Sequence, residues 1–124
     1  MTEANAYSKE QQLARGDRRY RRKVASPKAW QRIIDAKEGP CRCCNLNGPV
    51  QYHHLVPRAI GGSDVEDNIV PLCRYCHQLV TERDRRFCAL LRANLSDAEY
   101  AYAADLLGDA RFDDRYPVEY RSVS

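Results

Sequence analysis

All three histidines of the 124-residue chain lie in one short window, residues 52–77, which reads YHHLVPRAIGGSDVEDNIVPLCRYCH. His53 and His54 are adjacent, and His77 directly follows a cysteine pair. Imidazole is the commonest neutral nitrogen ligand for metals and also a base that titrates near neutral pH. The window therefore indicates metal binding, acid–base chemistry, or both.

Four cysteines around this window have the spacing of a metal site. Cys41-x-x-Cys44 and Cys73-x-x-Cys76 form two CxxC turns separated by 28 residues. Two such turns bring four thiolates onto one tetrahedral Zn²⁺, and a separation longer than the usual ~15 to 20 residues favours a hairpin looped out between them. The spacing predicts a structural zinc site, with chance placement or disulfides as the alternative.

The other two cysteines have different expected roles. Cys43 is an alternative ligand inside the stretch CRCC, whereas Cys88 is expected to be a small buried hydrophobe. Because structural zinc contributes on the order of 10 kcal/mol to the folding of small domains, Cys44→Ser is predicted to unfold the domain.

The histidines call for a separate explanation if the thiolates fill a closed site. On a regular strand His53 and His54 project to opposite faces, so they are expected to have two roles. If two strands fold back on the helix that begins near His77, that residue approaches the end of the first strand. One imidazole from each element could then hold a second metal ion with open coordination positions, leaving the other histidine of the pair as a base.

Local signals define the elements that must position these residues. Ser26-Pro27 is typical of a helix N-terminus and Gly39-Pro40 of a helix end. Two short strand patterns, VQYHHL and NIVPL, flank a loop broken by proline and glycine, VPRAIGGSDVED. The first strand would carry the histidine pair and the second would lead into the CxxCH stretch.

The C-terminal third is predicted to be largely helical. Residues 74–93 carry apolar positions at helical spacing, and a further helix is predicted to begin at the N-cap Ser96 and to end near Gly108. The stretch YPVEYRSVS, residues 116–124, is expected to be a surface tail.

Charge is distributed unevenly along the chain. Residues 1–40 carry ten Lys or Arg against five Asp or Glu, whereas residues 89–124 carry four against seven. The densest basic stretch, RGDRRYRRK, runs from Arg15 to Lys23 and includes Tyr20. It is predicted to be an arm that binds the phosphates of a polyanion, with a solvated or disordered segment as the alternative.

Composition limits the setting of the protein. The mean hydropathy is −0.68, and no apolar run approaches the ~20 residues that a bilayer span needs. The first ten residues, MTEANAYSKE, carry no secretory signal, so a reducing, cytoplasmic location without membrane contact is expected.

The motifs CRCC, YHHLVPRAIGG and DNIVPLCRYCH, taken in this order, resemble the HNH endonuclease family, in particular its small zinc-containing members from phages and bacteria. The resemblance covers about residues 41–80. It implies an α+β fold with a zinc-stabilised ββα-metal core and flanking helices, in which a hairpin packs on a helix around one catalytic divalent cation.

The resemblance also implies roles for single residues. His54 corresponds to the general base, His53 and His77 to ligands of the catalytic cation, and Asn68 to the asparagine that pins the loop. Gly61 and Gly62 would allow a tight loop. Many family members carry another histidine four residues after the last one, and here that position is Thr81. A cation site formed by two imidazoles with water and phosphate oxygens favours Mg²⁺ or Mn²⁺, with Ni²⁺ or Zn²⁺ as alternatives.

The expected function is hydrolysis of DNA phosphodiester bonds with weak sequence preference. The candidate DNA contacts are Arg18, Arg19, Arg21, Arg22, Lys23 and Arg58. Arg58 is equally well explained as a plain surface arginine. Phage terminase packaging proteins are the partners expected for phage members of the family. The alternative function is a non-catalytic, zinc-stabilised module for nucleic-acid binding or assembly.

Three regions follow from these assignments. Residues 1–25 are expected to form the basic arm, residues 26–93 the HNH nuclease domain with its zinc turns, and residues 94–124 a C-terminal helix and tail packed on the core.

Overall fold

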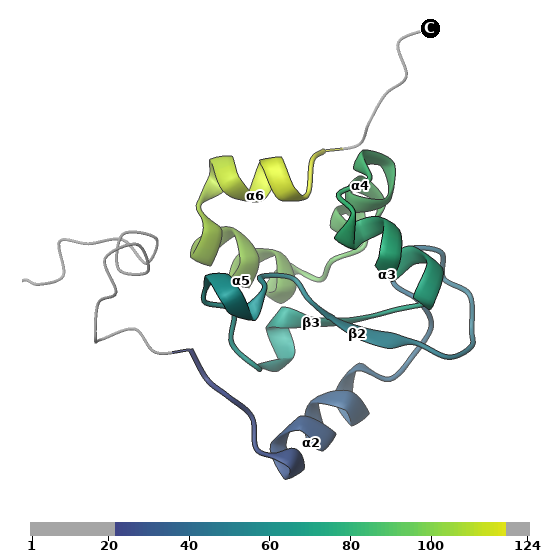
Figure 1. The fold of residues 1–124 in the computed structure, drawn as a ribbon, viewed down its shortest axis with the longest axis vertical. Helices are drawn as coiled ribbons and strands as arrows, with labels where there is room; N and C mark the ends of the chain where they lie inside the picture. The colour runs from purple at the N-terminus through teal and green to yellow at the C-terminus, as the bar shows by residue number, and fades with distance from the viewer. Residues whose placement is uncertain (1–21, 119–124) are drawn as a thin grey trace, which may run out of the picture.

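The structure, a computed structural model, describes residues 22–118 (Figure 1). Its elements in chain order are α2 (Pro27–Lys37), β2 (Gln51–His54), the 3₁₀ helices η1 (Arg58–Ile60) and η2 (Glu66–Asn68), β3 (Ile69–Leu72), α3 (Arg74–Thr81), α4 (Arg85–Ala93), α5 (Asp97–Leu107) and α6 (Asp109–Arg115). Two short strands followed by a helix lie at the centre of a mostly helical molecule. The fold is therefore α+β with a ββα core, as predicted.

The two strands form an antiparallel hairpin in which His53 pairs with Val70 and His54 with Ile69. Every residue of β3 is buried, whereas β2 is more exposed. Helix α2 lies on one side of the hairpin and α3 to α6 on the other (Figure 1). Because neighbouring strand residues project to opposite faces, the histidine pair is directed toward different helices.

Helix α2 begins where the sequence predicts. Ser26 is its N-cap, with Oγ accepting a hydrogen bond from the Ala29 N–H at 3.1 Å, and Pro27 occupies the first helical position. None of the residues of α2 is fully buried. Its packing alone therefore anchors it weakly, and polar contacts described below attach it to the rest of the molecule.

The helical stretch predicted for residues 74–93 is divided into two helices, α3 and α4. Arg83 between them adopts a left-handed backbone conformation with φ 65°. Asp84 then caps α4, because its carboxylate accepts a hydrogen bond from the Phe87 N–H at 3.0 Å. An aspartate that satisfies free N–H groups at a new helix start competes with continuation of the old helix.

The prediction of a surface tail for residues 116–124 is wrong at Tyr116, which is buried. The chain forms the short helix α6 after Gly108, and Tyr116 directly follows that helix with only 1% of its surface exposed. The physical reason is the hydrophobic core, which includes Phe112 and Tyr116 together with Leu107 of α5. Local sequence signals do not report a contact of this kind.

One hydrophobic core joins the hairpin to the C-terminal helices. Leu55, Leu72, Leu91, Leu107 and Phe112 all belong to the same buried cluster. Helix α5 begins with a capping box between Ser96 and Glu99, in agreement with the predicted N-cap. Within the described residues, no helix is long and apolar enough to cross a membrane.

Candidate active site and metal centre

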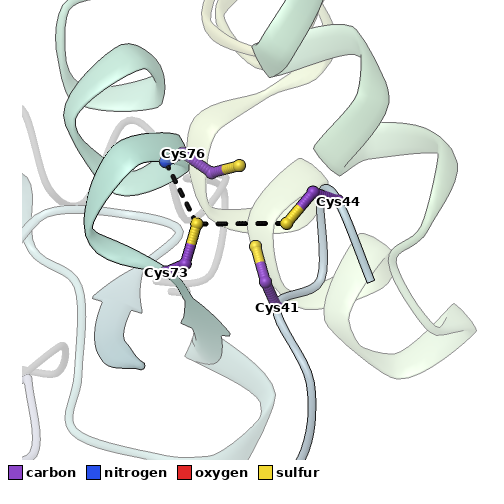
Figure 2. Close-up of side chains that lie close together, drawn as sticks. All are labelled: Cys41, Cys44, Cys73 and Cys76. Atoms are coloured by element: carbon purple, nitrogen blue, oxygen red, sulfur yellow. Dashed lines mark hydrogen bonds between the residues drawn. The ribbon is translucent and has the colours of Figure 1, made fainter. Parts of the chain in front are cut away.

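The four predicted zinc ligands come together at one point. The Sγ atoms of Cys41, Cys44, Cys73 and Cys76 all lie within 4.8 Å of one another (Figure 2). Figure 2 shows that one pair comes from the loop before β2 and the other from the start of α3. The hairpin is therefore looped out between the two turns, as the sequence predicts.

The sulfur geometry fits a zinc ion. A Zn–S distance of about 2.3 Å places the corners of a tetrahedral site about 3.8 Å apart. The Sγ atoms of Cys44 and Cys73 are 3.9 Å apart, which matches that edge. Four sulfur donors and no carboxylate form the donor set of a closed structural site. The cysteines can therefore hold a metal ion such as zinc.

The electrostatics of the cysteines differ from one thiol to the next. Burial works to raise the pKa of Cys41, but surrounding backbone hydrogen bonds lower it to about 7. Burial raises the pKa of Cys43 to about 12, and its thiol donates to the Phe87 carbonyl at 3.6 Å. Cys43 lies outside the group of four. Cys88 is 1% exposed, so it is the buried small hydrophobe that was expected.

The structure brings His53 and His77 together from different elements. The His53 ring on β2 meets the His77 ring on α3 edge to face, with centroids 5.3 Å apart. Burial, with the neighbouring His77 and His54, lowers the pKa of His53 to about 3, and burial also lowers the pKa of His77. Both imidazoles are therefore neutral at pH 7, which is the form that binds a metal ion.

A hydrogen bond fixes which nitrogen of His77 is free. Its Nδ1 lies 2.6 Å from Oε1 of Gln51. Because a carboxamide oxygen only accepts, Nδ1 carries the proton and Nε2 keeps its lone pair. Metal-ligating histidines are commonly oriented by such a partner on their second nitrogen. The residues present thus fit a cation site with two imidazole donors.

His54 has a different environment on the other face of the strand. Its ring stacks on Trp30 of α2 at a centroid distance of 5.8 Å and an interplanar angle of 9°. Its Nε2 lies 2.9 Å from Oδ1 of Asp64, a side chain only 2% exposed. Arg58 also donates to Asp64, through Nε at 3.1 Å. The two histidines therefore occupy separate environments, in agreement with two roles.

Asp64 is ionised in this arrangement. Burial works to raise its pKa, but hydrogen bonds from His54, the Ala25 N–H and Arg58 outweigh burial and hold the pKa below its ordinary value. An ionised carboxylate accepts hydrogen bonds and donates none. His54 Nε2 must therefore carry a proton, which leaves Nδ1 as the basic nitrogen.

Asn68 holds the loop that follows the histidines. Its side chain is fully buried, its Oδ1 accepts from the Val56 N–H at 2.8 Å, and its Nδ2 donates to the carbonyls of Val56 and Ser63 at 3.0 and 2.9 Å. Gly62 lies against the same point, and a Cβ there would approach the Val56 carbonyl oxygen to 1.7 Å. Only glycine allows this approach.

One open pocket of about 490 Å³ is lined by some of these groups, whereas His77 is not part of its wall. His53 and His54 both line it at the end of β2, together with Thr81 of α3. The two arginines in its wall, Arg58 and Arg115, could each meet a phosphate. Thr81, the residue at the position of a third histidine in many family members, therefore faces the same pocket as the histidine pair.

The predicted DNA-binding arm is only partly described. Arg18, Arg19 and Arg21 lie outside the described residues, whereas Arg22 and Lys23 lie within them. Lys23 pairs with the loop beside the site, because its N–H donates to Ser63 Oγ and its carbonyl accepts from the Asp64 N–H, both at 2.7 Å. The basic stretch therefore joins the described structure next to the partner of His54.

Sequence reasoning missed three residues at the site. Asp64 lies in a loop whose acidic residues give no sign of which one is buried, and Trp30 lies inside the helix predicted after Ser26, where no local pattern indicates a contact with a histidine. Tyr116, whose hydroxyl lies 3.0 Å from His53 Nε2, is 63 residues away in sequence. Its contact with the histidine exists only in the folded chain.

The comparison with protein families agrees with this geometry. Residues 41–83 match the family model described as HNH endonuclease. The resemblance inferred from the motifs is therefore confirmed for this segment.

A comparison with curated proteins adds a relative. The chain is 37% identical over 60 residues to the type IV methyl-directed restriction enzyme EcoKMcrA of Escherichia coli (strain K12). The similarity covers 41% of this chain and 21% of that enzyme, so the chain spans about a fifth of the length of the relative. The family match and this relative together support a nuclease-type function.

Proposed function

We propose that this protein is a metal-dependent endonuclease that hydrolyses DNA phosphodiester bonds, with His54 as the general base and His53 and His77 as ligands of a divalent cation. The observation that carries the proposal is the convergence of these groups. The His53 and His77 rings meet edge to face with centroids 5.3 Å apart, while His54 shares a pocket with His53 and two arginines.

The protein's own residues support each part of the hydrolysis. The Asp64 carboxylate keeps a proton on His54 Nε2, so Nδ1 is the atom that accepts a proton from the attacking water. Arg58 and Arg115 in the pocket wall would orient the phosphate. When bound at His53 and His77, a divalent cation supplies Lewis-acid stabilisation of the charge on the phosphate and on the leaving 3′-oxygen. Mg²⁺ or Mn²⁺ suits the phosphate and water oxygens, with Ni²⁺ or Zn²⁺ as alternatives.

The basic stretch is proposed to hold the DNA backbone. Lys23 is exposed and lies two residues from Ala25, whose N–H donates to Asp64 Oδ2 at 3.0 Å. A phosphate chain bound along Arg18, Arg19, Arg21 and Arg22 would therefore reach the fold beside His54. Contacts of this type are made to phosphates, which are the same for every base. Weak sequence preference is therefore expected.

The relative that shares a similar segment is named as a methyl-directed restriction enzyme. For this chain, restriction is a candidate setting and phage packaging with a terminase is another. Both depend on DNA cleavage, and cleavage is therefore the property to test first.

The decisive experiment is cleavage of supercoiled plasmid by zinc-loaded protein in Mg²⁺, Mn²⁺, Ni²⁺, Zn²⁺ or chelator, run beside His54→Ala. Metal-dependent nicking or linearisation is expected, with a loss of roughly 10²- to 10⁴-fold in the variant, since the base is removed. DNA binding by the variant should remain, because the described contacts of His54 are with Trp30 and Asp64, neither of which is a proposed DNA contact.

One observation favours the second candidate, a non-catalytic zinc-stabilised DNA-binding or assembly module. Thr81 occupies the position of a third imidazole and offers only a hydroxyl. If folded, zinc-loaded protein binds DNA but cuts it with none of the four ions, the nuclease proposal fails and the module takes its place.

A further inference from the structure

Tyr116 contacts the candidate cation site from outside the HNH segment. It follows α6, 33 residues after the end of the family match at residue 83, and it is 1% exposed. Its hydroxyl oxygen lies 3.0 Å from His53 Nε2 and 2.6 Å from the carbonyl oxygen of Leu55. The phenol is therefore placed between the histidine and the strand end that carries it.

The two hydrogen bonds determine the tautomer of His53. A phenol has one proton to donate, and the Leu55 carbonyl can only accept, so the Tyr116 proton is directed to Leu55. The phenol oxygen then accepts a hydrogen bond from His53, which requires the proton of the neutral imidazole on Nε2. Nδ1 of His53 is thereby left with its lone pair.

The C-terminal helices hold the phenol in place. The Tyr116 N–H donates to the Phe112 carbonyl at 2.8 Å, and the two rings pack with centroids 5.7 Å apart. Arg92 of α4 donates from Nη1 to the Tyr116 carbonyl at 2.9 Å and also lies over the Phe112 ring. The position of the Tyr116 hydroxyl is thus fixed by contacts with Phe112 and Arg92 in addition to its contact with His53.

We propose that Tyr116 is a positioning residue for the divalent-cation site, fixing His53 in the Nε2–H tautomer so that Nδ1 is presented as the ligand atom. The inference rests on the proposed function, because it assigns a partner to one of the two proposed ligands. Gln51 acts in the same way on His77, where Nδ1 is protonated and Nε2 is free. The C-terminal segment is therefore part of the metal site and more than a cover for the core.

Tyr116→Phe tests the inference with little change in packing, because the buried ring is kept and only the oxygen is removed. The affinity of zinc-loaded protein for Mn²⁺ or Ni²⁺, measured by titration calorimetry, should fall by about 10- to 100-fold. Tyr100→Phe is the matched control. Its hydroxyl accepts a hydrogen bond from Nη2 of Arg92 at 3.0 Å, the same arginine that contacts Tyr116. Tyr100 is, however, 40% exposed, and the structure describes no contact between it and His53. It should keep the wild-type affinity.

The tautomer is read directly by long-range ¹H–¹⁵N NMR on protein carrying one equivalent of Zn²⁺, so that the cysteine site is filled. Wild-type His53 should show the Nε2–H pattern, and Tyr116→Phe should show a mixture of tautomers. A purely structural role for Tyr116 would lower the melting temperature without changing this pattern. Wild-type His53 protonated on Nδ1, or equal cation affinity in Tyr116→Phe, would overturn the role of Tyr116.

Failure of the proposed function gives a different result. If wild-type protein binds no second cation, the site itself is refuted. If wild-type protein binds the cation and cuts DNA, and Tyr116→Phe does both equally well, the nuclease stands and only the positioning role of Tyr116 is refuted.

Discussion

Asp64 is the buried carboxylate on which the candidate base and the N-terminal segment both depend. Its side chain is 2% exposed and accepts hydrogen bonds from His54, Arg58 and the Ala25 N–H. Since it is ionised, it fixes the proton of His54 on Nε2 and at the same time neutralises Arg58. A single residue thus links the proposed proton transfer to the segment that carries the basic stretch.

Asp64→Asn should impair cleavage without removing the cation site. The amide can donate as well as accept, so it no longer enforces the Nε2–H tautomer of His54. We expect kcat for plasmid cleavage to fall roughly 10- to 100-fold, as for other partners of active-site histidines. Affinity for Mn²⁺ should stay unchanged, because Asp64 has no described contact with His53 or His77.

Asp67→Asn is the control for that substitution, because Asp67 is exposed on η2 of the same loop. It should cleave like wild-type protein. Equal cleavage rates for Asp64→Asn and wild type would show that the carboxylate does not assist His54.

At the level of elements, the two CxxC turns tie the start of α3 to the loop before β2. Cys73 is at once the N-cap of α3 and a member of the sulfur cluster, so metal binding and helix initiation depend on the same residue. His77 lies in the next turn of α3. The cluster therefore sets the position of the helix that presents a proposed cation ligand.

Cys44→Ser should abolish the structural zinc site and unfold the domain. Structural zinc contributes on the order of 10 kcal/mol, comparable to the whole stability of a small domain. Zinc content by elemental analysis and the thermal melt by circular dichroism are the measurements. Cys43→Ala is the control, because Cys43 lies in the same turn but outside the cluster, and it should keep one zinc ion. A Cys44→Ser protein with unchanged zinc content and melt would refute the four-cysteine assignment.

For the molecule as a whole, Glu99 of α5 joins the end of α2 and the loop of the first cysteine pair, 62 and 57 residues earlier in the chain. Its carboxylate is 1% exposed and forms ion pairs with Lys37 at the end of α2 and with Arg42 in the cysteine loop. It also accepts from the Ser96 N–H at 2.8 Å. Because α2 has no fully buried residue, this pairing is a main attachment of the helix that supplies Trp30 to the site.

Glu99→Gln should lower the free energy of unfolding by about 3 kcal/mol, since removing one member of a buried ion pair leaves the other charges uncompensated. Burial works to raise the pKa of Glu99, but Arg42 and Lys37 hold it below its ordinary value. The unfolded chain therefore binds this proton first as the pH falls. The contribution of Glu99 is present above about pH 4.3 and is lost as the pH drops through the folded pKa.

Urea denaturation between pH 3 and 7 measures both effects. The difference in stability between wild type and Glu99→Gln should be constant near neutral pH and shrink below about pH 4. Asp97→Asn, an exposed acid in the first turn of the same helix, is the control and should change little. A difference that does not depend on pH would show that Glu99 stabilises the fold by packing and not as an ion.

The charge distribution gives a prediction for the full chain with its arm. Replacing Arg18, Arg19, Arg21 and Arg22 by serine should weaken DNA binding and reduce the slope of log K against log salt by about 0.9 for each phosphate that the arm no longer neutralises. Fluorescence anisotropy with duplex DNA at several salt concentrations measures the slope. If wild-type protein bound DNA equally well at low and moderate salt, the predicted role of the arm in binding phosphates would be wrong.

The division of the chain into an arm, a nuclease domain and a C-terminal part stays a prediction. Leu107 and Phe112 from the C-terminal part belong to the same core cluster as Leu55 after β2. The part after residue 93 is thus continuous with the core of the HNH segment in the described residues.

What the sequence alone determined is local. The CxxC spacings, the adjacent histidines and the capping residues Ser26 and Ser96 act through neighbours a few residues away, so they predicted the sulfur cluster, the opposite faces of the strand and the helix starts. The break between α3 and α4 was missed because Asp84 is equally compatible with a helix interior and a helix cap. Its hydrogen bond to the Phe87 N–H makes it a cap.

The tertiary structure alone decided which other groups surround the histidines. Asp64 is one of several acids in its loop, and only the fold buries it against His54. Tyr116 belonged to a stretch expected to be a surface tail, yet core packing with Phe112 places its hydroxyl 3.0 Å from His53. Contacts between residues 63 positions apart depend on how the helices pack, and no local pattern in the sequence encodes them.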